Sequence, residues 1–234
     1  MNPAFDEEQA RKAVAAIYKW SETKNSNDLL GNDPNVFLQV TTKRILKKNK
    51  SMSVKPKRIA LKYSPYSDAA EACLIVKNDA EKWEEKLKEL DVNWVTKVIT
   101  VKSLKAMQFE EKRKLTSSYE LFLVDDRIQH AAMSVSGGVF AKKNKYPAAV
   151  RLSGDIKARL QKMLISSYTR PTEGVCHSAR IGHLGMNKDH LYQNLLAALP
   201  KLVEIGANGW QAVQTIGVQP ERGPTLPLYS DSSE

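Results

Sequence analysis

Between residues 72 and 124 the sequence alternates short apolar, β-rich runs with longer segments of helical character. The β-rich runs are residues 72–76, 95–101 and 121–124. The segments between them, capped by Asp79 and running to 90, and from about 103 to 115, have the length of helices. Strands and helices that alternate in this way are typical of a small parallel sheet with helices packed on it. The pattern predicts a Rossmann-like, three-layer α/β domain.

The chain on either side of this alternation has a different pattern. Before it we expect a helix over 6–22 and strands over 36–42 and 58–63. After it we expect a loop over 136–138 and 142–145, a helix over 156–163, strands over 164–168 and 175–181, a helix over 188–203, a last strand over 213–218 and an extended tail. The simplest architecture is a discontinuous α+β domain of residues 1–67 and 155–234, interrupted by the inserted α/β domain of residues 68–154.

Positive charge is concentrated in one segment of the chain. Lys and Arg number 36 against 26 Asp and Glu, which gives a formal net charge of +10. Residues 34–67 contain no acidic residue, and their basic residues are Lys43, Arg44, Lys47, Lys48, Lys50, Lys55, Lys57, Arg58 and Lys62. Clustering of this kind indicates a binding site for a polyanion such as nucleic acid. A solvated, lysine-rich face is the alternative interpretation.

No set of residues with catalytic spacing stands out. The chain has no G-x-G-x-x-G after a predicted strand and no P-loop motif. Asp125 and Asp126 follow a strand, where open α/β sheets bind ligands, but Asp is also the usual N-cap of a helix. Cys176 and His177 are adjacent, so on a strand they point to opposite faces and do not form a metal site or a thiol dyad. We therefore expect a binding protein, not an enzyme, without a cofactor, a metal or a small-molecule substrate.

Other features of the sequence concern the compartment. No run of about 18 apolar residues is present, so we expect no membrane span. The acidic start lacks the apolar core of a secretion signal. The two cysteines, Cys73 and Cys176, cannot form a disulfide framework, which fits a reducing compartment.

Residues 181–186 close a predicted strand just before a predicted helix. Gly182 and Gly185 would let the backbone approach another surface, including an RNA sugar-phosphate chain. Arg180 and Lys188 flank them with positive charge. A tight strand-to-helix connection explains the same glycines without RNA.

Several longer motifs resemble the ribosomal protein L1 family. They are Gly-His-Leu-Gly-Met at 182–186, Asn194 in the following helix and Gly-Trp-Gln-Ala-Val at 209–213, while Val-Phe-Leu-Gln-Val at 36–40 is similar to the first strand of that family. Segments 121–128, 176–186 and 226–229 resemble more closely the nucleolar L1-domain proteins of ribosome biogenesis, including the U3-associated type of the small-subunit processome. The resemblance implies the L1-like two-domain fold. It also implies a non-enzymatic, pre-rRNA-binding assembly factor in nucleolar pre-ribosomal particles, with a role in rRNA processing.

The chain departs from the ribosomal members in the loop after the last predicted strand. Those members carry Ser-Thr-Met-Gly there, whereas this chain has Pro-Glu-Arg-Gly at 220–223, and Glu221 would repel phosphate. We therefore expect RNA contact to depend on Lys43, Arg44, Lys47, Lys48, Lys50, Lys57 and Arg58. The residues expected to border that surface are Arg180, Gly182, His183 and Gly185, with Arg222 as a weaker contact.

The inserted domain would contact other assembly proteins or a second RNA element. Two alternative functions remain open at this point. One is a mature large-subunit stalk protein, and the other is a nucleotide-binding enzyme that acts through the inserted domain.

Overall fold

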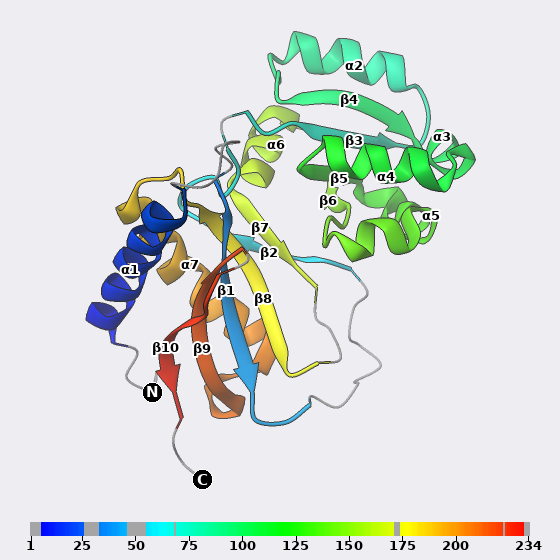
Figure 1. Ribbon diagram of the computed structural model, residues 1–234. Helices are drawn as coiled ribbons and strands as arrows, with labels where there is room; N and C mark the ends of the chain where they lie inside the picture. Colours follow the sequence, from blue (N-terminus) through cyan, green and yellow to red (C-terminus); the bar gives the residue numbers. More distant parts are fainter. Residues whose placement is uncertain are drawn as a thin grey trace. The chain divides into compact units, whose positions relative to one another are not determined.

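The computed structural model describes residues 6–25, 33–45, 55–67, 69–170, 174–221 and 223–231 (Figure 1). The chain divides into two compact units. One, the discontinuous unit, consists of Met1–Pro65 and Ile165–Glu234, and the other, the inserted unit, is Tyr66–Leu164. Among the described helices, none is both long enough and apolar enough to cross a lipid bilayer.

The inserted unit is built on a parallel four-stranded sheet. Its strands are β3 (Ala72–Val76), β4 (Val95–Thr100), β5 (Leu121–Asp125) and β6 (Ala148–Val150), in the order β4-β3-β5-β6. All five residues of β3 are buried, which is typical of a strand that is covered on both faces. The helices are α2 (Ala80–Glu89), α3 (Val101–Ala106), α4 (Phe109–Ser118), η1 (Asp126–Ile128), α5 (Gln129–Lys142) and α6 (Ile156–Leu164).

Several local expectations for this unit are wrong. The single helix over 103–115 is two helices, because Gln108 opens α4 with a capping box in which its backbone N–H donates to Glu111 Oε2 at 2.9 Å. Asp79 lies in the left-handed region (φ 56°) and makes no side-chain capping bond to α2. The expected loop at 136–138 is confined to Gly137, whose non-helical backbone (φ 61°, ψ −158°) separates two helical segments within α5. Strand β6 has only three residues and was not expected from the sequence.

The discontinuous unit contains antiparallel sheets. A four-stranded sheet has the order β10-β9-β1-β8, and β2 pairs with β7. The elements are α1 (Glu7–Asn25), β1 (Asn35–Thr42), β2 (Lys57–Ala60), β7 (Ser166–Thr169), β8 (Cys176–His183), α7 (Lys188–Ala207), η2 (Trp210–Ala212), β9 (Val213–Pro220) and β10 (Leu226–Ser230). The expectation that the strand at 213–218 is the last one is wrong, since β10 pairs with β9 and buries Leu228. Pro227 is tolerated there because β10 is an edge strand.

Helices α1 and α7 bury one face of the sheets in this unit. Along β1 the burial alternates, with Val36, Leu38 and Val40 buried in the same core as residues of both helices. Helix α7 contacts β1, β8 and β2, and α1 contacts α7, β9 and β10. The apolar alternation of β1 therefore fixes which face of the sheet is turned away from the helices.

The chain leaves and re-enters the discontinuous unit at neighbouring positions. Ala60 is paired with Ser166, and the Leu61 N–H donates to the Ile165 carbonyl at 3.2 Å. The return falls after α6, about ten residues later than the sequence pattern indicates, because α6 contacts β6 and belongs to the inserted unit. The mixed α/β class with parallel and antiparallel sheets is confirmed.

Candidate nucleic-acid interface

The face of the four-stranded sheet that α1 and α7 do not cover, the helix-free face, carries polar and aromatic side chains in rows. Phe37 of β1 is paired with Arg180 of β8 and with Gln219 of β9. Two residues along, Gln39 is paired with Ser178 and Gly217, and Thr41 is paired with Cys176 and Thr215. Because paired residues of antiparallel strands share a face, these rows form one surface, opposite Val36, Leu38 and Val40.

Strands β2 and β7 form a separate two-stranded sheet beside β8, and they extend the helix-free face by an arginine and a tyrosine. Arg58 is paired with Tyr168, and Ile59, the next residue, is fully buried in the core with α7. Alternation then places Arg58 and Tyr168 on the side away from α7. Strand β7 continues the surface beside β8, since Thr169 Oγ1 donates to the Ser178 carbonyl at 2.8 Å.

The combination on the helix-free face suits RNA. Phe37 and Tyr168 are half-buried aromatic residues, and aromatic rings of this kind stack on unpaired bases. Arg58 and Arg180 supply guanidinium groups, which bind phosphate in a planar, bidentate way. Gln39 and Gln219, whose side-chain amides are hydrogen-bonded to each other, add polar groups between these cations.

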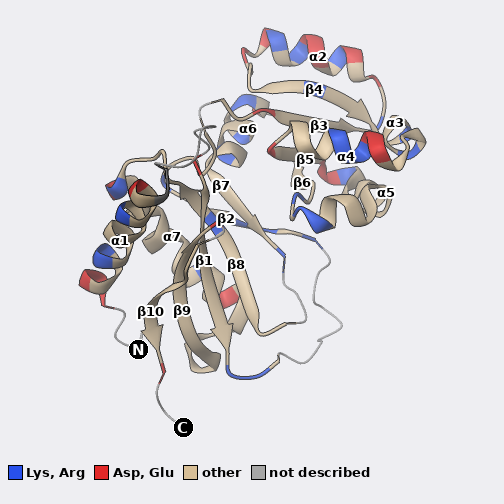
Figure 2. Ribbon diagram, viewed as in Figure 1, with Lys and Arg blue, Asp and Glu red and all other residues tan. Residues whose placement is uncertain are grey.

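The first basic residues of the basic segment 34–67, Lys43 and Arg44, directly follow the C-terminal end of β1. Figure 2 shows its cations in blue at that end and on β2. Lys43 forms an ion pair with Asp231 (Nζ–Oδ2 2.6 Å), and Arg44 is exposed. Lys47, Lys48 and Lys50 lie outside the described residues.

Lys57 does not share the face of Arg58. It alternates with Arg58 and therefore lies on the side of Ile59 and α7. The pKa of Glu204 on α7 is lowered by a hydrogen bond from Lys201 and, to a smaller extent, by the positive charge of Lys57. The charge of Lys57 is thus directed toward α7, away from the helix-free face.

The second group of expected residues lies at the other end of β1. Gly182 is paired with Val36 and His183 with Asn35, whereas Lys43 follows the last residue of β1, Thr42. At about 3.4 Å per residue, the two ends of β1 are about 24 Å apart. The two groups therefore do not form one cluster but lie toward opposite ends of β1, and Gly182, which is paired with buried Val36, is on the face that α7 covers.

Gly182 and Gly185 lie close to other parts of the same unit. A Cβ on Gly182 would lie 2.6 Å from Met186 Sδ and 2.8 Å from Leu191 Cδ1. A Cβ on Gly185 would collide with the Asp33 carboxylate. Close packing within the chain is therefore one reason for a glycine at each of these two positions.

The loop after β9 is tied to the start of β1. Glu221 Oε2 accepts a hydrogen bond from Asn35 Nδ2 at 2.9 Å, and the Glu221 N–H donates to the Asn35 carbonyl at 2.7 Å. The Glu221 carboxylate thus lies at the corner where ribosomal members carry uncharged residues. Arg222 lies outside the described residues.

Cys176 and His177 are neighbours on β8 that differ in exposure. Cys176 is exposed and His177 is buried, as expected for neighbours on a strand. Within the described ranges, no group of three or more His, Cys, Asp or Glu side chains could hold a metal ion.

A known protein family matches most of the chain, across both units. The model of the ribosomal protein L1p/L10e family matches residues 12–224. The chain belongs to this family. The expected resemblance to the L1 family is therefore confirmed.

Individual relatives distinguish two branches of the family. The chain is 31% identical over 239 residues to "Ribosomal L1 domain-containing protein 1" of Mus musculus, covering 97% of this chain and 52% of that protein. It is 28% identical over 222 residues to a Schizosaccharomyces pombe protein named for ribosome biogenesis, covering 90% of this chain and 59% of that protein. Large ribosomal subunit protein uL1 of Drosophila melanogaster is 26% identical over 117 residues, covering 50% of this chain and 54% of that protein. The chain thus spans about half the length of the relatives that it matches.

Sequence reasoning missed Tyr168 and the placement of Phe37. The placement of Phe37 could have been predicted from the alternation along β1, which puts Phe37 on the face opposite the buried residues. The pairing of Arg58 with Tyr168 joins residues 110 positions apart, and no local pattern predicts it.

Proposed function

We propose that this L1-family chain binds structured rRNA through the helix-free face and the basic segment of the discontinuous unit, as a non-enzymatic factor of ribosome assembly. The observation that carries the proposal is that two neighbouring sheets present these residues on the side away from α7. Phe37 and Arg180 lie on the four-stranded sheet, and Arg58 and Tyr168 lie on the two-stranded sheet of β2 and β7. This face supplies ring surfaces for bases and guanidinium groups for phosphates.

The assembly role is favoured over that of a mature stalk protein. The S. pombe protein that is named for ribosome biogenesis matches over 90% of this chain and the mouse L1-domain-containing protein over 97%, whereas uL1 of Drosophila matches over 50%. The Glu221 carboxylate at the corner between β1 and β9 adds negative charge near the end of the face. We further propose, from the resemblance of segments 121–128, 176–186 and 226–229, that the chain acts in nucleolar pre-ribosomal particles, with the small-subunit processome as the first candidate and assembly proteins as partners.

A matched pair of variants tests the RNA face. Arg58 and Lys57 are neighbours of equal charge on opposite faces of β2. Arg58→Ala should weaken binding of an rRNA fragment about tenfold, since it removes a charge-assisted phosphate contact. Lys57→Ala should have a clearly smaller effect, because its charge is directed toward α7. Equal losses in the two variants would contradict the assignment of this face.

Sedimentation separates the two candidate roles. The tagged chain should travel with precursor particles and be absent from translating ribosomes, and crosslinked RNA should map to precursor rRNA. Recovery of the chain in translating ribosomes would favour the stalk protein.

A further inference from the structure

The inserted unit has a pocket that the RNA proposal does not use. In the sheet of this unit, with the order β4-β3-β5-β6, the strand that follows β3 in sequence lies on one side of β3, and the next strand, β5, lies on its other side. Ligands of open α/β sheets bind in the crevice at the carboxyl ends of the strands, where the order reverses in this way. The residues that line a pocket of about 340 Å³ at these ends are Trp83, Asp125, Asp126, Arg127, Arg151, Leu152 and Ser153. That volume is within the range of small-ligand sites, roughly 300–1,000 Å³.

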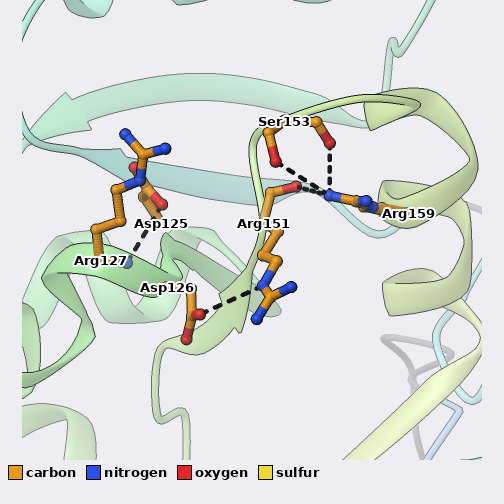
Figure 3. Close-up of polar contacts among 6 residues, drawn as sticks. All are labelled: Asp125, Asp126, Arg127, Arg151, Ser153 and Arg159. Atoms are coloured by element: carbon orange, nitrogen blue, oxygen red, sulfur yellow. Dashed lines mark hydrogen bonds and ion pairs between the residues drawn. The ribbon is translucent and has the colours of Figure 1, made fainter.

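The loops that form the pocket are held by contacts of their own (Figure 3). Arg159 Nη1 donates to the carbonyls of Arg151 and Ser153, which fixes the loop after β6. Asp125 Oδ1 accepts a hydrogen bond from the Arg127 N–H at 3.3 Å, so Asp125 is the N-cap of η1, as the structural interpretation of the sequence proposed. Fixed loops bind a ligand at a low cost in conformational entropy.

Charged groups at the mouth of the pocket remain available to a ligand. Asp126 Oδ2 lies 3.7 Å from Arg151 Nε, and these side chains are 46% and 76% exposed, so the ion pair between them is weak. Within the described residues, the Arg127 guanidinium makes no hydrogen bond or ion pair. Lys86 Nζ lies over the Trp83 ring, 5.0 Å from its centroid, and places a positive charge beside the indole.

We propose that this pocket binds one guanosine nucleotide. The indole of Trp83 offers a surface for stacking a base, and the guanidinium groups of Arg127 and Arg151 offer donors for a phosphate. The carboxylates select the base. Guanine presents two neighbouring N–H donors, which match the two acceptor oxygens of one carboxylate. Adenine, cytosine and uracil each place an acceptor beside the donor, and a carboxylate repels that acceptor.

The nucleotide has two sources, an unpaired guanosine in RNA and a free guanosine nucleotide. Both present the same base and phosphate to the pocket. The inference does not rest on RNA binding by the discontinuous unit, because all the residues that carry it belong to the inserted unit.

Nuclear magnetic resonance of the full chain tests the proposal. The indole N–H signal of Trp83, assigned with Trp83→Phe, is followed during titration with GMP, AMP, CMP, UMP and guanosine. We expect GMP to shift the Trp83 signal in a saturable way, and the other nucleotides to bind about tenfold or more weakly. Short single-stranded RNAs with and without one guanosine form the second arm. Tighter binding of the guanosine-containing RNA than of GMP identifies RNA as the source, and the reverse identifies the free nucleotide.

Variants separate the recognition of the base from the recognition of the phosphate. Asp125→Asn with Asp126→Asn should abolish the preference for guanine, since an amide replaces an acceptor oxygen by a donor while Asn still caps η1. Arg127→Ala with Arg151→Ala should reduce the affinity for GMP to that for guanosine. Arg113→Ala is the control, since Arg113 is an exposed arginine of the same unit and pairs with Glu110 outside the pocket lining.

Two results would overturn the proposal. One is the absence of any shift of the Trp83 signal with GMP and with the guanosine-containing RNA. The other is a shift of equal size with all four nucleotides that the aspartate and arginine variants leave unchanged. Neither result bears on the RNA face of the discontinuous unit, which Arg58→Ala tests separately.

Discussion

His177 and Asn194 are buried polar residues of the discontinuous unit whose side chains are satisfied to different extents. Asn194 uses its whole amide, accepting from the N–H groups of Lys62 and Tyr63 and donating to the carbonyls of Tyr63 and Ile181. His177 is 4% exposed, and its Nε2 has no hydrogen-bond partner among the described residues. Burial lowers the pKa of His177 from 6.5, because the charged imidazolium is poorly solvated there. His177 therefore makes the stability of this unit depend on pH.

The first prediction concerns that dependence. The unfolded chain protonates His177 at a higher pH than the folded chain, so the stability that neutral His177 provides is present above pH 6.5 and is lost as the pH falls below it. The loss is up to about 1.4 kcal/mol for each pH unit between the two pKa values. Urea unfolding of the wild type and of His177→Phe at neutral and mildly acidic pH measures it. We expect the variant to lose part of the pH dependence, while His130→Gln, at an exposed histidine, keeps it. An unchanged dependence in His177→Phe would contradict this account.

The second prediction compares two helical glycines. A Cβ on Gly206 would lie 2.9 Å from the Cβ, Cγ and Cδ2 atoms of His177, whereas a Cβ on Gly138 would meet nothing within 4 Å. Gly206→Ala should therefore destabilise the chain by about 1–3 kcal/mol through overpacking. Gly138→Ala should stabilise it by about 0.5–1 kcal/mol, because alanine restricts the unfolded chain. Thermal unfolding measures both, and a neutral Gly206→Ala would show that the packing against His177 is loose.

At the scale of elements, α7 connects segments that are far apart in sequence. Asn194 holds residues 62–63, just before the chain leaves the unit, against β8. The sequence predicted the helix and most strands of this unit from apolar spacing, and it predicted opposite faces for Cys176 and His177. It did not predict β10, whose pairing with β9 is decided by tertiary contact of Leu228 with the core. It also did not predict the role of Asn194, because that role depends on backbone groups 131 residues away.

The third prediction tests this connection. Asn194→Ala removes the partners of several backbone groups near the crossing, so it should destabilise the chain by about 2–4 kcal/mol. Gln193→Ala is the control, because Gln193 accepts one hydrogen bond from the exposed side chain of Lys62. Its effect should stay within about 0.5 kcal/mol. Equal effects of the two variants in chemical unfolding would mean that the Asn194 network is not needed.

At the scale of the whole molecule, both ends of the chain build one unit. The sequence predicted this discontinuity from the change of pattern around the inserted strands. The position at which the chain returns to the discontinuous unit was harder to predict, because the apolar spacing of α6 is the same whichever unit it joins. Only the contact of α6 with β6 assigns this helix to the inserted unit. The RNA surface, which stays a prediction, was expected from the charge of the basic segment and from the resemblance to the L1 family. Its face was not, because the pairing of β2 with β7 separates Arg58 from Lys57.

The fourth prediction follows from the neighbouring crossings. Replacing residues 66–164 with a short Gly/Ser linker should leave a folded RNA-binding unit, because Leu61 and Ile165 are already hydrogen-bonded. Circular dichroism and RNA binding of this shortened chain check the expectation. A product that is unfolded would show that the discontinuous unit depends on the inserted one.

The salt dependence of RNA affinity tests the central claim most directly, namely that the basic segment and the helix-free face bind phosphates. If about five cations contact phosphates of an unpaired strand, log K should fall with a slope of about −3.5 against log salt, or about a hundredfold between about 50 and 200 mM. Replacing Lys47, Lys48 and Lys50 together with alanine should reduce that slope by about 2, and Arg222→Ala by less than about 1. A slope near zero with tight binding, or a larger effect of Arg222→Ala than of the triple variant, would contradict the account.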